Sequence, residues 1–209
     1  MYLFFDTETT GLPINWNAPI SDFSNWPRIV QIAWAHYDEN GKEIKSKSYI
    51  IKPENFFIPI ESARVHGITT EIANEKGVAI KAVLNELTRA LKEAEYLIAH
   101  NISFDEKIVG AEYLRKNMPN AVQFKNKICT MESSVDFCKI PGNDKYKFPK
   151  LEELYYILFK NHFSNAHDAL VDVKACAKCF FELKKLGVIK IHEKKQEIKS
   201  LLQQSIFNF

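Results

Sequence analysis

Apolar and polar positions follow two different spacings along the chain, one typical of strands and one of helices. Short runs of aromatic and branched residues predict strands at Tyr2–Asp6, Arg28–Tyr37, Glu43–Ile51, Tyr96–Ala99 and Lys127–Thr130. Helical spacing or helix-forming composition predicts helices at 80–93, Ser103–Lys116, Leu151–Phe159 and Asp168–Leu186. Three strands followed by alternating helices and strands predict an α/β fold, whose sheet has an antiparallel edge and a parallel part.

Two polar loops that carry aromatic residues interrupt this pattern. The first, Leu12–Pro27, is rich in Pro, Asn and Ser. The second, Lys139–Lys150, mixes lysines with Tyr146 and Phe148. Both loops are candidates to shape a substrate groove, and the lysines that would contact phosphates in the second are Lys145, Lys147 and Lys150. The alternative for either loop is a solvated connection.

Composition is ordinary for a globular protein. The 209 residues suffice for one domain, and the net charge of +2 is too small to indicate a nucleic-acid partner by itself. No apolar run reaches the roughly 20 residues needed to cross a bilayer, and the N-terminus lacks the features of a signal peptide, so we expect a cytoplasmic protein without a membrane partner. Cys176 and Cys179 form a CxxC in a predicted helix, where packing is a better interpretation than zinc binding.

The first chemical motif, FFDTETTG, places Asp6 and Glu8 at the end of a predicted strand. Residues two apart in a strand point to the same face, so the two carboxylates face the same way. An unpaired carboxylate at the end of an apolar run is costly to bury, and a cation removes that cost. The alternative is an acidic turn at the strand end.

The second motif, AHNISFDEK, places Asp105 at the start of a predicted helix. Helix capping by Asp105 or Ser103 is an alternative to a chemical role.

The third motif, HDALVDVK, opens the last helix with His167 and Asp172, and Ser164 or Asn165 are candidate caps. His167 and Asp172 are five positions apart, so on a helix their side chains would point about 140° apart around the axis. The two can therefore flank one site.

Together these five residues predict a metal-dependent hydrolytic site. Carboxylate oxygens without thiolates select Mg²⁺ or Mn²⁺ over zinc. A pair of such ions lowers the pKa of an attacking water and stabilises the leaving oxygen of a phosphodiester. A histidine beside that water can take its proton near neutral pH.

The three motifs, in this order, resemble the DEDD-type 3′–5′ exonucleases of the histidine subclass, and in particular the proofreading epsilon subunit of bacterial DNA polymerase III. The resemblance covers about residues 2–186 and rests on D-x-E at Asp6 and Glu8, N-x-x-F-D ending at Asp105, and H-x-A-x-x-D from His167 to Asp172. It implies a ribonuclease-H-like fold with a five-stranded mixed sheet flanked by helices. It also implies an exonuclease domain at 1–186 and a C-terminal tail at 187–209.

The resemblance implies a role for each residue. Asp6, Glu8 and Asp172 would hold one of two divalent cations, Asp6 and Asp105 would contact the second, and His167 would be the general base. The 3′-terminal nucleotide would be bound by Thr9, Thr10, Gly11, Leu12, His66, Asn101 and Phe104. For Phe104 the alternative is a core anchor, and for His66 a turn residue.

The expected reaction releases nucleoside 5′-monophosphates from the 3′ end of single-stranded or frayed DNA, in proofreading or repair. An RNA-trimming exoribonuclease is the alternative, because nothing in the motifs distinguishes ribose from deoxyribose. A non-catalytic nucleic-acid-binding or polymerase-scaffolding subunit is a more distant alternative. Near the end of the chain, Gln203–Phe207 resembles the peptide with which polymerase-associated proteins dock on the sliding clamp; a tail packed on the domain is the alternative.

Overall fold

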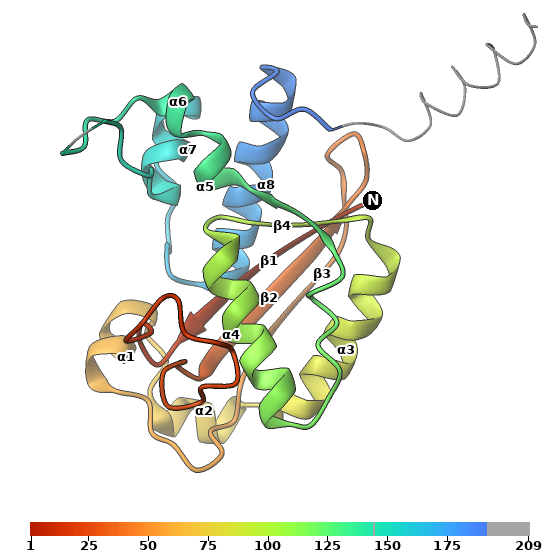
Figure 1. Ribbon diagram of the computed structural model, residues 1–209, viewed down its shortest axis with the longest axis vertical. Coiled ribbons are helices and arrows are strands. Elements are labelled where there is room, and N and C mark those ends of the chain that lie inside the picture. Colours follow the sequence, from red (N-terminus) through yellow and green to blue (C-terminus); the bar gives the residue numbers. More distant parts are fainter. Residues whose placement is uncertain (144, 192–209) are drawn as a thin grey trace, which may run out of the picture.

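A computed structural model describes residues 1–143 and 145–191 (Figure 1). The predicted five-stranded mixed sheet is confirmed, with strand order β3-β2-β1-β4-β5. β1 pairs antiparallel with β2 and β2 with β3, whereas the pairs β1–β4 and β4–β5 are parallel. The strands are β1 (Tyr2–Thr9), β2 (Ile29–Tyr37), β3 (Glu43–Ile50), β4 (Tyr96–Ala99) and β5 (Asn126–Cys129).

The four predicted helices are present, with ends that differ by a few residues: α3 (Ile80–Glu93), α4 (Ile102–Arg115), α7 (Leu151–Phe159) and α8 (Ala169–Lys185). Four short helices were not predicted: α1 (Ile60–His66), α2 (Thr70–Lys76), α5 (Thr130–Ser133) and α6 (Val135–Cys138). With four to seven residues each, they complete at most two turns, which is too short for an apolar period to be visible in the sequence.

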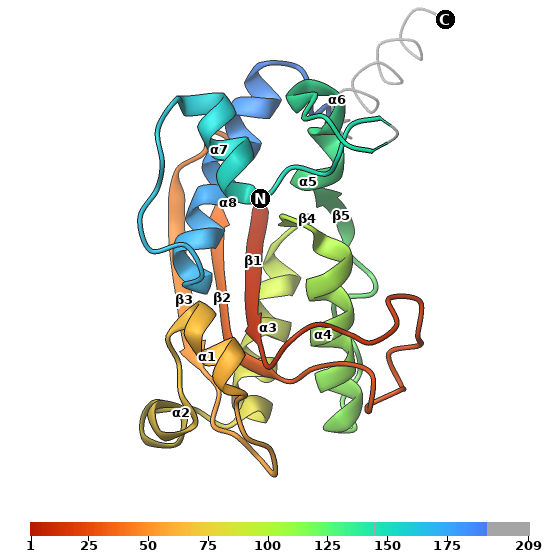
Figure 2. The same cartoon turned by 90° about the vertical axis from the view of Figure 1, so that its left-hand side faces the viewer.

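The sheet separates two layers of helices. Figure 2 shows α7 and α8 on one side of the sheet, and α3 and α4 on the other. Along β1, Leu3 and Phe5 belong to the core shared with α3 and α4, and Tyr2 and Phe4 to the core shared with α8. Continued alternation turns Asp6 and Glu8 toward the α8 side, as the strand spacing predicted.

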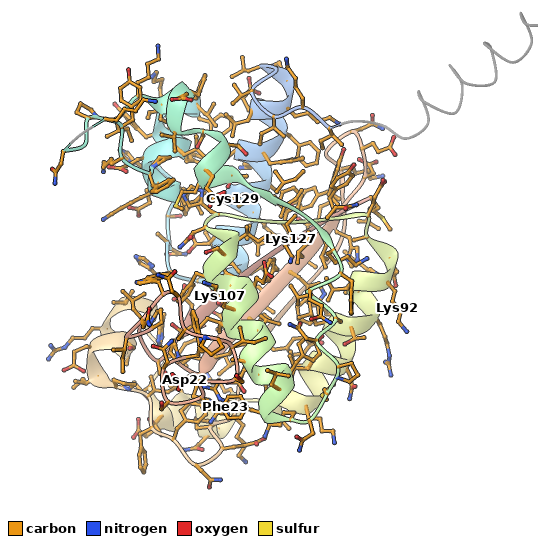
Figure 3. All side chains as sticks on the ribbon, in the orientation of Figure 1. Asp22, Phe23, Lys92, Lys107, Lys127 and Cys129 are labelled. Carbon is orange, nitrogen blue, oxygen red and sulfur yellow. The ribbon has the colours of Figure 1, made fainter. Side chains whose placement is uncertain are left out.

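The loop between β1 and β2 is packed onto α4, so a merely solvated connection is the wrong description of it. Arg115 of α4 donates to the backbone carbonyls of Phe23 and Trp26, and its guanidinium lies 5.3 Å from the centre of the Phe23 ring. Lys107, one turn from the N-terminal end of α4, donates to the Trp16 carbonyl at 2.6 Å. Figure 3 shows Lys107 beside the segment that carries Asp22 and Phe23.

Cys176 and Cys179 are buried residues of α8 that belong to the core between this helix and the sheet, which supports their interpretation as packing residues. Among the described residues, none of the helices has the length and apolarity required to cross a membrane.

Candidate active site

Asp6 and Glu8 begin the site on β1. Asp6 is partly buried, and only 9% of Glu8 is exposed. Burial raises the pKa of Asp6 well above its usual value, and the charges of Asp105, Asp172 and Glu8 raise it further. Burial, followed by the charges of Asp172 and Asp105, raises the pKa of Glu8 to about 8. Four carboxyl groups from three separate segments therefore lie close enough to oppose one another's ionisation.

Asp105 lies in the first turn of α4 and is almost completely buried, with 2% exposed. Its Oδ1 accepts hydrogen bonds from the backbone N and from Oγ1 of Thr7, at 3.0 and 2.7 Å. Burial raises the pKa of Asp105 to about 7, although the hydrogen bonds from Thr7 oppose the rise. Neither Asp105 nor Ser103 caps α4: the N-cap position is Asn101, in a left-handed conformation and without a side-chain capping bond.

Asp172 lies in the first turn of α8. Its Oδ2 accepts a hydrogen bond from the backbone N of His167 at 3.0 Å, and its Oδ1 is buried without a hydrogen-bond partner among the described residues. Burial raises the pKa of Asp172 to about 6, against the lowering effects of the bond from His167 and of the His167 charge. The φ of +69° at His167 is uncommon for a residue with a side chain, and such backbone strain concentrates at functional sites.

The turn before α8 is tied to the sheet by Gln31, a residue that the sequence analysis did not identify. Asp168, and not Ser164 or Asn165, caps the helix. Its Oδ1 accepts hydrogen bonds from the backbone N of Leu170 and of Val171. Gln31 Nε2 donates to Asp168 Oδ2 at 3.3 Å, and Gln31 Oε1 accepts from the Ala169 backbone N at 3.1 Å. The only sequence signal for this role was the amide side chain of Gln31 within the apolar run of β2.

The donor atoms fit a hard divalent cation. One ligand atom each from Glu8, His167 and Asp172 lie within 4.8 Å of one another. Asp172 Oδ1 has no other partner, and the raised pKa of each carboxyl group shows how poorly the cluster is compensated by the protein alone. His167, predicted as a general base, thus also lies within the ligand cluster.

The last residue of β1 and the turn that follows it contain the first four predicted nucleotide-binding residues. Thr9 Oγ1 donates to the Gly11 carbonyl at 2.6 Å, and Thr10 Oγ1 accepts from the Arg28 backbone N at 2.9 Å. Both hydroxyl groups therefore stabilise the turn itself. The φ of +147° at Gly11 favours glycine, and the following Leu12 is 71% exposed.

His66 lies beside this turn, at the last position of α1. Gly67, with a φ of +75°, ends the helix and allows the Ile68 backbone N to donate to His66 Nδ1 at 3.2 Å. Nε2 then carries the proton, and it is buried without a partner of good geometry among the described residues. Burial lowers the pKa of His66, and so does the charge of His167, whereas the backbone of Thr9 raises it. The turn role is therefore observed, and Nε2 faces the Thr9 backbone without a hydrogen bond of good geometry.

Asn101, Phe104 and a cavity complete the surroundings. Phe104 packs partly against the core and partly against Trp16. A cavity of about 380 Å³ opens beside the carboxylates, and its lining includes Asn101, Phe148, Phe163, His167 and Asp172. A larger cavity of about 570 Å³, near Tyr37 and Phe181, contains none of the predicted site residues.

The second loop is held to this cavity by His100. Its Nε2 is 2.9 Å from the Pro149 carbonyl and its Nδ1 is 3.0 Å from Thr130 Oγ1. Burial lowers the pKa of His100 to about 4, so it is neutral at physiological pH and donates from Nε2 to Pro149. Lys147 forms an ion pair with Glu153. The predicted contact between Lys147 and a phosphate would therefore compete with this ion pair.

Comparison with known proteins places the chain in a family. It matches the family described as Exonuclease (RNase_T) over residues 3–180. Similar solved structures are those of E. coli exonuclease I: a zinc-bound complex with single-stranded DNA (21% identity, TM-score 0.71), a complex with dA16 (21%, 0.70) and a complex with dT13 (21%, 0.70). Each alignment covers 88% of this chain and 40% of the exonuclease I chain. No curated protein matches the sequence.

The chain belongs to the exonuclease family, and the prediction of an exonuclease is confirmed. The shared architecture with exonuclease I also confirms the ribonuclease-H-like fold. The chain spans about 40% of the length of the exonuclease I chains, which contain further polypeptide that has no counterpart in the alignment.

Proposed function

We propose that this protein is a metal-dependent 3′–5′ exonuclease that releases nucleoside 5′-monophosphates from the 3′ end of single-stranded or frayed DNA. The observation that carries the proposal is the convergence of Asp6, Glu8, Asp105 and Asp172, with raised pKa values, beside His167. Family membership supplies the reaction class.

Each group would have a separate task. Asp6, Glu8 and Asp172 would hold one Mg²⁺ or Mn²⁺, and Asp6 and Asp105 would contact a second. When bound, such ions activate the attacking water and stabilise the charge on the leaving 3′-oxygen. His167 accepts the proton from that water at a ring nitrogen, or ligates a cation, since its donor atom lies in the ligand cluster. Thr7 orients Asp105 through its two hydrogen bonds.

The residues that we propose for nucleotide binding would surround this centre. The turn at 9–12 supplies backbone groups and the exposed side chain of Leu12. His66 would offer its Nε2–H, which has no hydrogen bond of good geometry among the described residues, to an oxygen of the terminal nucleotide. Asn101 lines the cavity next to His167 and Asp172, and Phe104 offers a ring to a base.

Single-stranded DNA is the favoured substrate because the similar exonuclease I structures carry single-stranded DNA, dA16 and dT13. RNA trimming is the second candidate, and a non-catalytic binding role the third. Membership of the histidine subclass, likeness to the epsilon subunit, a role in proofreading or repair, and a cytoplasmic location remain predictions. The clamp-docking peptide Gln203–Phe207 lies outside the described residues, and docking on a sliding clamp or polymerase remains a prediction too.

Matched DNA and RNA oligonucleotides with a label at either end test the reaction. With Mg²⁺, a 5′-labelled DNA strand should give a ladder that shortens from the 3′ end, whereas a 3′-labelled strand should release its label at once as a mononucleotide. Mispaired 3′ ends should be degraded faster than paired ones. A 3′-labelled strand that shortens progressively would show the opposite polarity, and faster loss of RNA than DNA would favour the second candidate.

A further inference from the structure

Trp16 differs from the other tryptophans of the chain in being exposed. Its exposed fraction is 42%, whereas Trp26 and Trp34 are 2% and 3% exposed. One side of the indole lies against Phe104, with ring centroids 5.7 Å apart and planes inclined by 46°. A large aromatic side chain is thus presented to solvent on a second ring, in the loop between β1 and β2.

The loop around Trp16 is fixed and not free to fold away. Lys107 donates to the Trp16 carbonyl at 2.6 Å, and its ammonium nitrogen lies 5.4 Å from the centre of the Trp26 ring. One residue before Trp16, the backbone of Asn15 exchanges two hydrogen bonds with the side chain of buried Asn25, at 2.7 and 3.0 Å. A pre-ordered ring loses little conformational entropy when a ligand covers it.

The chain connects this aromatic pair to the candidate active site from two directions. Phe104 directly precedes Asp105, whose carboxylate belongs to the site. On the other side, the nucleotide-binding turn leads through Leu12 and Ile14, which are 71% and 88% exposed, into Trp16. Figures 1 and 2 agree that the loop lies alongside α4, the helix that carries Phe104 and Lys107. Exposed apolar side chains gathered beside a site indicate a binding surface.

We propose that Trp16 and Phe104, with Lys107 held at the Trp16 carbonyl, form a stacking platform for an unpaired nucleobase of the strand whose 3′ end occupies the carboxylate site. This inference rests on the proposed function. An aromatic face accepts any base, and a lysine next to it favours the adjacent phosphate. A base inside a duplex has both faces covered by its neighbours, so the platform selects single strands and frayed ends.

Intrinsic fluorescence tests the platform without catalysis, because Trp16 is the exposed tryptophan among three. Excess chelator would prevent hydrolysis and low salt would favour binding while a dT12 oligonucleotide is titrated into the full chain. We expect saturable quenching by the single strand and much weaker quenching by the same strand in a blunt duplex. Trp16→Phe should lose the quenching, because the two remaining indoles are buried.

Steady-state kinetics provide a second readout. Stacking of one base contributes roughly 1–3 kcal/mol, so Trp16→Ala should raise the KM for single strands roughly five- to 150-fold with little change in kcat. Trp16→Phe should retain most of the affinity. Phe124→Ala is the matched control, because Phe124 is 82% exposed but precedes β5 at the end of the sheet away from Asn101; its KM should not change.

The outcomes separate the platform from the proposed function. Hydrolysis with no quenching and an unchanged KM for Trp16→Ala would overturn the platform and leave the exonuclease intact. Quenching by single strands without hydrolysis in Mg²⁺ or Mn²⁺ would support the platform and remove the proposed function. Quenching of equal depth by the duplex would overturn the selection for unpaired bases. Circular dichroism of both Trp16 variants would detect a loss of fold.

Discussion

Thr7 and Asp105 are joined by two hydrogen bonds across 98 positions of sequence, with both the backbone N and the hydroxyl of Thr7 donating to the same carboxylate oxygen. The pair connects β1 to the first turn of α4 and fixes one carboxylate of the site relative to the other three. Thr7 points to the α4 side of the sheet, opposite to Asp6 and Glu8. One strand thus supplies two carboxylates on one face and, on the other, the residue that orients Asp105 of α4.

Thr7→Val tests this connection, since it keeps the shape of the side chain and removes one donor. The remaining burial should raise the pKa of Asp105 further above about 7. The acidic limb of the rate–pH profile should therefore move to higher pH, and unfolding free energy should fall by about 0.5–1.5 kcal/mol. Thr7→Ser, which keeps the hydroxyl, is the control. An unshifted profile for Thr7→Val would mean that the bond does not tune Asp105.

Gln31→Leu tests the link between β2 and the start of α8. It would leave the buried Ala169 backbone N without its acceptor, at a cost of about 1–3 kcal/mol in urea unfolding. Because the same amide bonds Asp168, the turn that carries His167 should loosen, and the Mg²⁺ concentration for half-maximal rate should rise. Ser48→Ala removes only the outer partner of Gln31, 3.2 Å away, and should have a smaller effect. Equal behaviour of the two variants would contradict the linking role.

Metal-free protein should lose stability as the pH rises from 6.5 to 8. Folding raises the pKa of Glu8 from 4.5 to about 8 and that of Asp105 from 3.8 to about 7. The stability contributed by these protonated acids is complete below the unfolded pKa values and is lost as the pH passes the folded ones. The lowered pKa values of His36, His66 and His100 act in the opposite sense, but only below about 6.5, where unfolded histidine is charged.

Thermal melting in excess chelator measures this slope. Tm should fall between pH 6.5 and 8, and added Mg²⁺ should restore most of the loss, because the cation binds the ionised carboxylates of the folded state. Glu8→Gln should flatten the slope. A melting temperature that is constant or rising over this interval in wild-type protein would contradict the carboxylate cluster.

His167→Ala should lower kcat by roughly 10²–10⁴, as expected for loss of a general base. If His167 instead acts as a ligand, the affinity for Mg²⁺ should fall together with the rate. His162→Ala is the matched control: His162 lies in the same loop and stacks on Tyr156 with ring centroids 4.8 Å apart, away from the carboxylates. A full rate for His167→Ala would remove the histidine from the mechanism.

Local pattern predicted the sheet well, because β2 is a continuous apolar run and α3 carries a clear helical apolar period. The short helix α1 has no buried residue at all, so its sequence contains no period to detect, and its only signals were turn residues such as Gly67. Spacing predicted that Asp6 and Glu8 share a face. The partners Thr7 and Gln31 were not predicted, because hydrogen bonds over 98 and 137 positions depend on the completed fold.

The loop between β1 and β2 shows the same limit. Its Pro and Asn residues indicate an irregular segment, and nothing local predicts that Trp16 rests on Phe104, a residue of α4. The tertiary contact, not the composition, makes the loop a candidate part of the nucleotide-binding surface.

The most direct test of the account is the initial rate at which a 5′-labelled single-stranded DNA oligomer is shortened from its 3′ end. It would be measured with Mg²⁺ for wild type and Asp6→Asn, and for wild type in excess chelator. Metal ions contribute several kcal/mol to the transition state, so both changes should lower the rate by roughly a thousandfold or more. Shortening from the 3′ end that persists in Asp6→Asn and in excess chelator would contradict a metal-dependent site built on these carboxylates.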